Sequence, residues 1–150
     1  GIGQYKDQVS PLHMLRVMGA IANKGMSVEP FIVDSTFFDG SNEDSYNFSK
    51  GQSTSLMKSE TAEKLKEMMR YTMKNQYKDS MFGGIEMCAK TGTAEVGEGK
   101  KPHGWMVGFS YDKTFPVAFS VVVENGDFGI RSAGPIASGM IRDIKKNYKI

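Results

Sequence analysis

A lysine, two threonines and a glycine follow one another as Lys90, Thr91, Gly92 and Thr93, inside a stretch of strand-forming residues. The lysine supplies a positive charge, and the threonine hydroxyls can donate hydrogen bonds to an anion. Glycine weakens the interior of a strand unless another group must approach the backbone closely there. The pattern therefore predicts a strand that binds a small anionic ligand. The plainer alternative is a solvated lysine among ordinary β-forming threonines.

Other kinds of chemistry find little support in the sequence. His13 and His103 are the only histidines, and neither stands in a spacing that holds a metal ion. Cys88 is the only cysteine, which excludes an intrachain disulfide. The glycines at 92 and 97 have the spacing of a phosphate-binding loop, but Glu98 stands where that loop requires lysine. We therefore expect no metal and no cofactor.

Composition and charge describe an ordinary globular chain. It has 150 residues, of which 39% are hydrophobic and 24% charged, and a formal net charge of +2. These values predict about one soluble domain without bulk attraction to nucleic acid or lipid. No apolar run approaches the roughly 20 residues of a membrane span. The opening residues, GIGQYKDQVSPL, resemble a loop that leads into a helix, so we expect an excised segment of a longer protein.

Three helices are predicted from caps and apolar spacing. The first is capped by Ser10, has Pro11 at its first position and ends at Gly25. Its apolar residues at helical spacing are Met14, Val17, Met18, Ile21 and Ala22. The second follows Ser59, with a predicted buried stripe of Leu65, Met68, Met69, Thr72 and Met73. The last opens at Pro135, with a predicted face of Ile136, Met140, Ile141, Ile144 and Tyr148.

Strands are predicted in two regions. Short extended pieces are expected over 26–38, followed by a polar loop over 40–55. Three strand candidates then follow in quick succession at 85–93, 105–111 and 117–124. Their short connections predict an antiparallel meander, because parallel neighbours need longer crossovers. Helices and a contiguous antiparallel sheet that are segregated along the chain indicate the α+β class.

The lysine motif stands in a wider pattern. It is the triplet Lys-Thr-Gly followed by Thr93, Ala94 and Glu95, and then by HGWMVGF at 103–109. This combination resembles the class B penicillin-binding proteins, the monofunctional D,D-transpeptidases that cross-link peptidoglycan. Four further segments are similar to the family, so the resemblance covers almost the whole chain: SPLHMLRVMGAIANKG, KSETAEKLKEMMRYTM, FPVAFSVVVENG and GPIASGMIRDI. The chain departs from the family at Gly104 and Met106, where alanine and phenylalanine are commoner, and at Cys88.

The resemblance implies a fold and a set of roles. Residues 1–150 would be the C-terminal portion of a β-lactamase/transpeptidase-like domain, with its meander packed by helices. Lys90 would attract the substrate carboxylate and favour deprotonation of neighbouring hydroxyls, and Thr91 and Thr93 would donate hydrogen bonds to that carboxylate. Gly92 would let a peptide lie against the strand edge, and the backbone N–H of Thr93 would form half of an oxyanion hole.

Two further residues lie near the motif. Trp105 is interpreted as part of the core or as a wall of the cleft. His103 is interpreted as a polar hinge residue.

The nucleophile that such chemistry needs is predicted to lie elsewhere. The family uses a serine in S-x-x-K, then S-x-N, then K-T-G. Ser55 with Lys58 and Ser45 with Asn47 match the first two patterns, but in the reverse order and within a polar linker. We therefore expect the catalytic serine, its lysine and the S-x-N asparagine upstream of Gly1, and an inactive isolated chain.

By resemblance, the whole enzyme would bind the D-Ala-D-Ala end of a stem peptide, form an acyl-serine and pass the acyl group to an amine. β-Lactams would be trapped at the acyl stage. The resemblance also implies a membrane-anchored parent, in a cell-wall synthesis complex on the extracytoplasmic face. Two alternatives stay open: a serine β-lactamase or β-lactam sensor domain, and a non-catalytic interaction domain on the same scaffold.

Overall fold

A computed structural model describes residues 8–33, 35–37, 44–47 and 53–147 of the chain. Its centre is an antiparallel sheet of β5 (Met87–Ala94), β6 (His103–Ser110) and β7 (Ala118–Val123), in that order. The meander predicted over 85–93, 105–111 and 117–124 is confirmed, with strand ends that differ by one or two residues. Thr93 faces Gly104 and Gly92 faces Trp105 across the first pair of strands.

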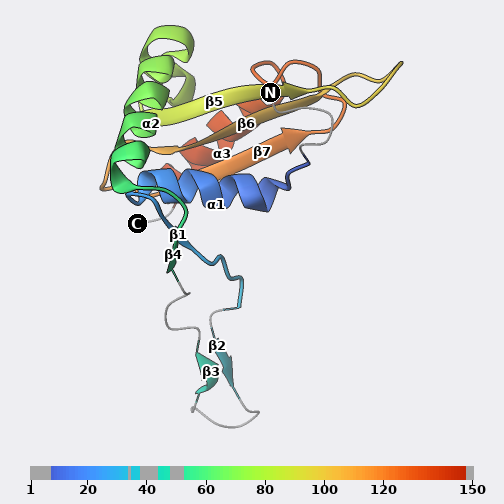
Figure 1. Cartoon of the computed structure of the whole chain (residues 1–150). Coiled ribbons are helices and arrows are strands. Elements are labelled where there is room, and N and C mark those ends of the chain that lie inside the picture. Colours follow the sequence, from blue (N-terminus) through green and yellow to red (C-terminus); the bar gives the residue numbers. More distant parts are fainter. Residues whose placement is uncertain (1–7, 34, 38–43, 48–52, 148–150) are drawn as a thin grey trace.

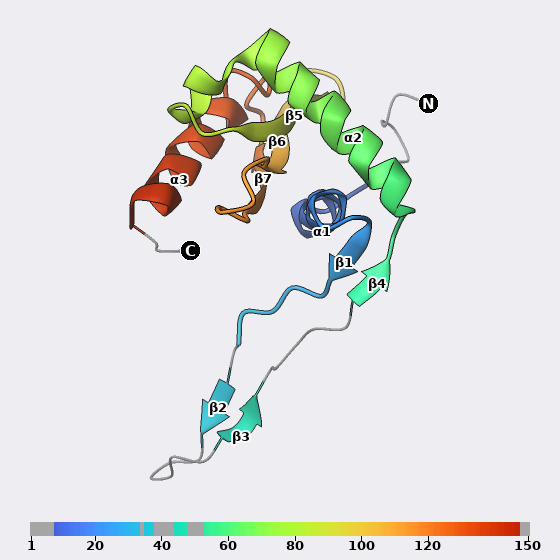
Figure 2. The ribbon, with the colours of Figure 1, turned by 90° about the vertical axis from the view of Figure 1, so that its left-hand side faces the viewer.

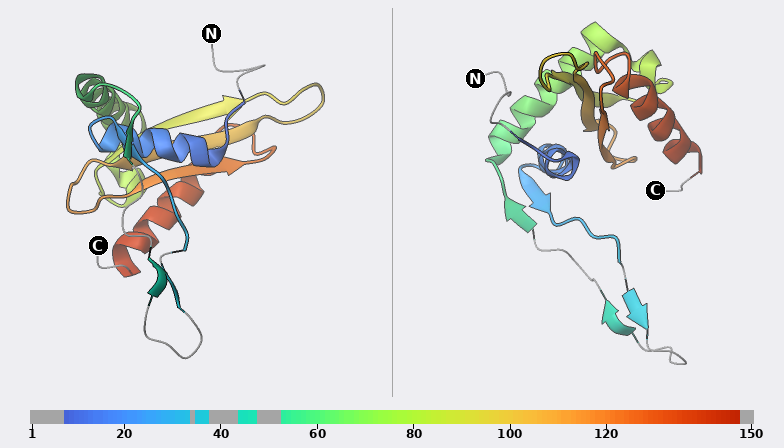
Figure 3. Two further views of the ribbon diagram at one scale, coloured as in Figure 1. Left: turned by 60° about the horizontal axis from the view of Figure 1, so that its bottom comes forward. Right: turned by 90° about the vertical axis from the view of Figure 1, so that its right-hand side faces the viewer.

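Helices cover both faces of this sheet, which confirms the α+β class. Helix α1 (Pro11–Ala22) lies along one face, and α2 (Ser59–Thr72) lies on the same side near β5 (Figure 1). Helix α3 (Ala133–Asn147) covers the opposite face (Figure 3). None of the helices in the described ranges combines the length and the apolar character that crossing a membrane requires.

Side chains of the strands alternate between two apolar clusters, because successive strand residues point to opposite faces. Met87, Ala89 and Met106 belong to the cluster under α3. Cys88 and Phe109 belong to the cluster under α1 and α2. The motif strand β5 is therefore anchored on both faces along its first half.

The start of α1 agrees with its sequence signals. The backbone N–H of His13 donates to Ser10 Oγ at 3.1 Å, and Pro11 occupies the first helical position. The helix ends at Ala22, and Gly25 follows with a φ of +92°, a left-handed conformation that favours glycine. Of the predicted apolar set, Met18 and Ile21 are buried, Met14 and Val17 are partly buried, and Ala22 is exposed at the end of the helix.

The buried stripes of the other two helices differ from the prediction. Met68 is 65% exposed, because the stripe of α2 follows four-residue steps through Leu65, Met69 and Met73. In α3, Ile136 and Met140 are exposed.

The helix α3 starts at Ala133, so Pro135 lies in its first turn, where proline is tolerated. Its buried face is Ala133, Ala137, Ile141 and Ile144, in which two small alanines let the helix approach the sheet closely. Tyr148 lies outside the described residues.

The polar loop predicted over 40–55 is wrong in part, because it contains two strands. Strand β3 (Asp44–Asn47) pairs with β2 (Ser35–Phe37), and β4 (Ser53–Ser55) pairs with β1 (Met26–Val28). Both pairs lie in an arm that extends away from the central sheet (Figures 1 and 2). Residues 53–55, which form β4, are exposed, so this strand needs no apolar alternation and gives no strand signal in the sequence.

Candidate active site

Backbone N–H and carbonyl groups of alternate residues point to the outer edge of β5, which is the edge away from β6. The carbonyl of Met87 accepts a hydrogen bond from Arg70 at 3.1 Å, and the N–H of Thr91 donates to the Tyr77 hydroxyl at 3.5 Å. In an antiparallel ladder, both backbone groups of a residue point to the same side, and this side alternates along the strand. The backbone N–H of Thr93 therefore faces the same outer edge as that of Thr91.

Lys90 places its charge at this edge. Its side chain is exposed, and the ammonium donates to the carbonyl oxygen of Thr91 at 2.9 Å. Among the described residues, β5 pairs only with β6, so its other edge faces away from the sheet. An anion that approached the outer edge beside Thr91 would meet the Lys90 ammonium.

The hydroxyl of Thr91 contacts a residue that the sequence did not single out. Thr91 Oγ1 lies 2.8 Å from the Tyr77 hydroxyl, and the tyrosine is half-buried. Tyr77 ends a π-helical turn, Met73–Tyr77, that continues α2. A signal was present: Tyr77 continues the four-residue spacing of Leu65, Met69 and Met73, with a polar tip on an apolar ring.

The second half of the motif is supported from behind by backbone. The connection between β7 and α3 packs against Gly92 and Trp105 so closely that a Cβ on Gly129 would lie 2.9 Å from the Trp105 nitrogen and overlap both carbonyl oxygens. A Cβ on Gly104, which faces Thr93, would lie 3.0 Å from the carbonyl oxygen of Asp127. Glycine is thus needed for contact between these segments, and the motif lies on a firmly held strand.

A buried arginine holds the beginning of the same strand. Arg70 is 5% exposed, and its Nη2 lies 2.8 Å from Asp79 Oδ2 and 2.8 Å from Glu86 Oε1. Its guanidinium also stacks on the Tyr111 ring, 5.4 Å from the ring centre. The hydrogen bond from Arg70 lowers the pKa of Asp79, which keeps this carboxylate ionised. The network ties α2 and the turn after it to Met87.

Cys88 is not equipped to act as a nucleophile. The thiol is buried, and burial raises its pKa to about 12. Its Sγ lies 3.6 Å from the carbonyl oxygen of Lys66 in α2. The thiolate, which is the reactive form, is thus strongly disfavoured at neutral pH.

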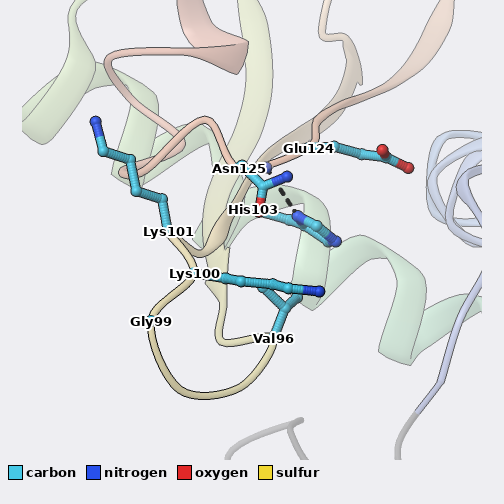
Figure 4. Close-up of a pocket in the computed structure, with 7 residues that line it drawn as sticks. All are labelled: Val96, Gly99, Lys100, Lys101, His103, Glu124 and Asn125. Atoms are coloured by element: carbon cyan, nitrogen blue, oxygen red, sulfur yellow. Dashed lines mark hydrogen bonds between the residues drawn. The ribbon is translucent and has the colours of Figure 1, made fainter.

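His103 lies at the far end of the strand pair, beside an open cavity of about 510 Å³ (Figure 4). The cavity is lined by Val96, Gly99, Lys100, Lys101, His103, Glu124 and Asn125. The N–H of Asn125 donates to His103 Nδ1 at 3.0 Å, so the proton of the neutral ring is on Nε2. This bond joins the start of β6 to the turn that follows β7, and the interpretation of His103 as a polar hinge stays a prediction. Trp105 is partly buried and packs against the cluster under α1, as a core residue.

The structure keeps the two serine patterns apart from the motif. Ser55 is exposed on β4, and its hydroxyl donates to the carbonyl of Met57 at 3.5 Å. Ser45 and Asn47 belong to β3 in the arm, away from β5 (Figure 2). Lys90, Thr91, Gly92 and Thr93 lie together on the edge strand β5, whereas neither serine pattern is brought to it.

Known proteins are similar to this chain in sequence and in fold. Residues 1–142 match the family described as the penicillin binding protein transpeptidase domain. A peptidoglycan D,D-transpeptidase, PbpA, of Mycobacterium tuberculosis is 30% identical over 137 residues, which cover 89% of this chain. The chain spans only 28% of that relative's length.

Solved structures agree with the sequence match. Penicillin-binding protein A of M. tuberculosis, in an imipenem acyl-enzyme complex, has a TM-score of 0.77 at 27% identity, over 93% of this chain and 32% of that one. The D,D-transpeptidase domain of a peptidoglycan glycosyltransferase from Eggerthella lenta has a TM-score of 0.77 at 25% identity, over 94% and 33%. Because the family match spans residues 1–142, the chain belongs to the penicillin-binding protein transpeptidase domain family.

Proposed function

We propose that residues 1–150 form the C-terminal portion of the transpeptidase domain of a class B penicillin-binding protein, and that the whole protein is a peptidoglycan D,D-transpeptidase. The observation that carries this proposal is the outer edge of β5, where Lys90 and the backbone of Thr91 face the same side as the N–H of Thr93. The sequence relatives support it, since the M. tuberculosis relative is a peptidoglycan D,D-transpeptidase.

Each residue of the motif has a task in this reaction. Lys90 attracts the terminal carboxylate of the substrate and favours ionisation of nearby hydroxyls. The Thr91 and Thr93 hydroxyls donate hydrogen bonds to the carboxylate, and Gly92 lets the peptide lie close to the strand as an added strand. The N–H of Thr93 stabilises the oxyanion, a contribution of roughly 10²–10³ in rate for such donors.

The attacking atom comes from outside this chain. A serine hydroxyl, with a lysine as its base, attacks the penultimate carbonyl of a D-Ala-D-Ala stem peptide and loses its proton to the base, and the terminal D-Ala leaves as an amine. An amine of a neighbouring strand then attacks the acyl-serine and releases the serine. A β-lactam also acylates the serine, but its leaving nitrogen remains attached to the acyl group, so the enzyme stays trapped.

The proposed substrate indicates the location of the protein, its partner proteins and its ligands. Peptidoglycan lies outside the cytoplasmic membrane, so we place the protein on the extracytoplasmic face of the bacterial cell membrane. An anchor upstream of this chain would hold it there, in a complex with other cell-wall synthesis enzymes. Its ligands are stem peptides and β-lactam antibiotics.

Mass spectrometry after treatment with a labelled penicillin tests the proposal. The 150-residue chain should form no covalent adduct, whereas the longer protein that contains it should be labelled on a serine. Lys90→Ala in the longer protein should slow acylation about 10- to 100-fold, the effect of losing a hydrogen bond to a charged group. Lys64→Ala is the matched control, because Lys64 is exposed and pairs only with Glu60 on α2 among its described contacts.

Three outcomes would contradict this assignment. A stable adduct on the 150-residue chain would place the nucleophile within it. Rapid turnover of penicillin by the longer protein would favour a β-lactamase. Absence of acylation would favour a non-catalytic interaction domain.

A further inference from the structure

Helix α2 crosses the outer edge of β5 from one face of the sheet to the other. Leu65 and Met69 pack into the cluster under α1, whereas Met73 and Tyr77 pack into the cluster under α3. Between these two pairs, Arg70 reaches the carbonyl of Met87 at the edge itself. Figure 1 shows α2 at the beginning of β5, with the rest of the strand extending beyond it.

The end of this crossing segment has an unusual backbone. The turn Met73–Tyr77 is π-helical, and the N–H of Lys78 donates to the carbonyl of Met73 at 2.7 Å. Lys78 has a φ of +69° and a ψ of 146°, a conformation that strongly favours glycine. The next residue, Asp79, is held by Arg70. Single π-helical turns often mark functional sites, and this one brings the Tyr77 hydroxyl to Thr91.

All three outward polar groups of Thr91 therefore have partners within the chain. Its carbonyl accepts from Lys90, its N–H donates to the Tyr77 oxygen, and its hydroxyl oxygen lies 2.8 Å from that same oxygen. A peptide added along the outer edge cannot pair with the backbone of Thr91 while these bonds are made. The end of the added peptide thus comes to lie beside the Thr91 hydroxyl.

We propose that Tyr77 is a positioning residue that orients the Thr91 hydroxyl toward the terminal carboxylate of the substrate, an inference that rests on the function proposed above. The Tyr77 oxygen accepts the Thr91 N–H and donates its own proton to Thr91 Oγ1. The Thr91 hydroxyl proton then points away from Tyr77 and is available to the carboxylate. Without the phenol, the Thr91 hydroxyl can rotate, and a carboxylate ligand binds less tightly.

Acylation kinetics of the longer protein with benzylpenicillin and with its methyl ester test this role. Tyr77→Phe keeps the ring and removes the hydroxyl, and Thr91→Val keeps the side-chain shape and removes the hydroxyl. The double variant completes a double-mutant cycle. Tyr71→Phe is the matched control, because Tyr71 lies on α2 and is 69% exposed. Saturation kinetics separate the dissociation constant of the initial complex from the rate constant of acylation.

We expect Tyr77→Phe to weaken binding of benzylpenicillin about three- to tenfold, the effect of one net hydrogen bond. The acylation rate constant should stay unchanged, and so should binding of the methyl ester, which has no free carboxylate. In the Thr91→Val background, Tyr77→Phe should have no further effect, since the two residues act in series. Thr91→Val alone should weaken the binding of benzylpenicillin to a similar extent, which keeps the test decisive if Tyr77→Phe folds poorly.

Several results would overturn the inference. Tyr77→Phe could leave the binding of benzylpenicillin unchanged, as Tyr71→Phe should. Its effect on binding could add to that of Thr91→Val, or it could weaken binding of the methyl ester as much as binding of benzylpenicillin. In each case the wild-type protein would still be acylated, so the proposed function would survive. A wild-type longer protein that formed no adduct would instead refute the proposed function, and this inference with it.

Discussion

Replacing Arg70 by methionine tests whether the buried network holds the motif strand in place. Methionine retains an unbranched apolar stem of similar reach but has no charge and no donor. The variant loses the bonds to Asp79 and Glu86 and the bond to the Met87 carbonyl. The fold should persist, because the apolar clusters on both faces of the sheet do not depend on the guanidinium.

The cost follows from how far each partner can be rehydrated. The side chains of Asp79 and Glu86 are 31% and 50% exposed, so each pair contributes only about 0.2–1 kcal/mol, as for exposed ion pairs. Met87 is fully buried, so its carbonyl loses a charged donor that water cannot replace, at about 1.5–3 kcal/mol. We therefore expect a loss of about 2–5 kcal/mol in the free energy of unfolding.

Urea unfolding followed by circular dichroism measures this loss. Arg16→Met is the control, because Arg16 and its partner Glu29, 3.1 Å away, have side chains that are 33% and 56% exposed. This control should lose about 0–1 kcal/mol. If Arg70→Met lost no more than Arg16→Met, the network would not be what attaches α2 to the beginning of β5.

The same pair of variants has a pH signature. The hydrogen bond from Arg70 lowers the pKa of Asp79 in the folded state. A depressed folded pKa stabilises the protein above the unfolded pKa of about 3.9, and this stabilisation is lost as the pH falls through the folded value. The difference in stability between the wild type and Arg70→Met should therefore narrow when unfolding is measured at pH 3 instead of pH 7. A constant difference would exclude Asp79 as a contributor.

Three further predictions concern other parts of the molecule. Gly104→Ala should lose about 1–3 kcal/mol in urea unfolding, because its Cβ meets Ser132 Oγ and the Asp127 carbonyl, and adding Ser132→Gly should recover part of the loss. Full destabilisation in the double variant would locate the strain at the backbone of Asp127 and Gly129. The Cys88 thiol should react with a thiol reagent at pH 8 only after unfolding, and fast reaction of the native chain would contradict its burial. Ser55→Ala in the longer protein should leave penicillin labelling unchanged, and loss of labelling would make Ser55 the nucleophile.

Local signals in the sequence determined several elements correctly. Ser10 and Pro11 specify the start of α1 through contacts within one helical turn, and Gly25 itself adopts the left-handed conformation that follows the helix. The connections between β5, β6 and β7 are too short for parallel crossovers, so the meander follows from chain length. The motif at 90–93 was recognisable because its residue types are adjacent in the chain.

Other features depend on contacts between distant segments, which residue types alone do not specify. Met68, Ile136 and Met140 are apolar and stand at nearly the right helical spacing. They are nevertheless exposed, because spacing alone does not set where a helix begins or which of its faces packs on the sheet. Strand β4 carries polar, exposed residues, so only its pairing with β1, across 25 or more residues, reveals it as a strand.

The sequence by itself thus determined the fold class, the meander and the residues that carry charge and hydrogen-bond donors. Only the tertiary structure decided how they face a ligand. Helix α2 crosses the edge of β5, which places Arg70 on Met87 and Tyr77 on Thr91. The four-residue spacing predicts that the Tyr77 ring packs among apolar side chains. The direction of its hydroxyl depends on the π-helical turn and on Thr91, 14 residues further along the chain. Such geometry results from packing and long-range hydrogen bonds, whose partners no local pattern encodes.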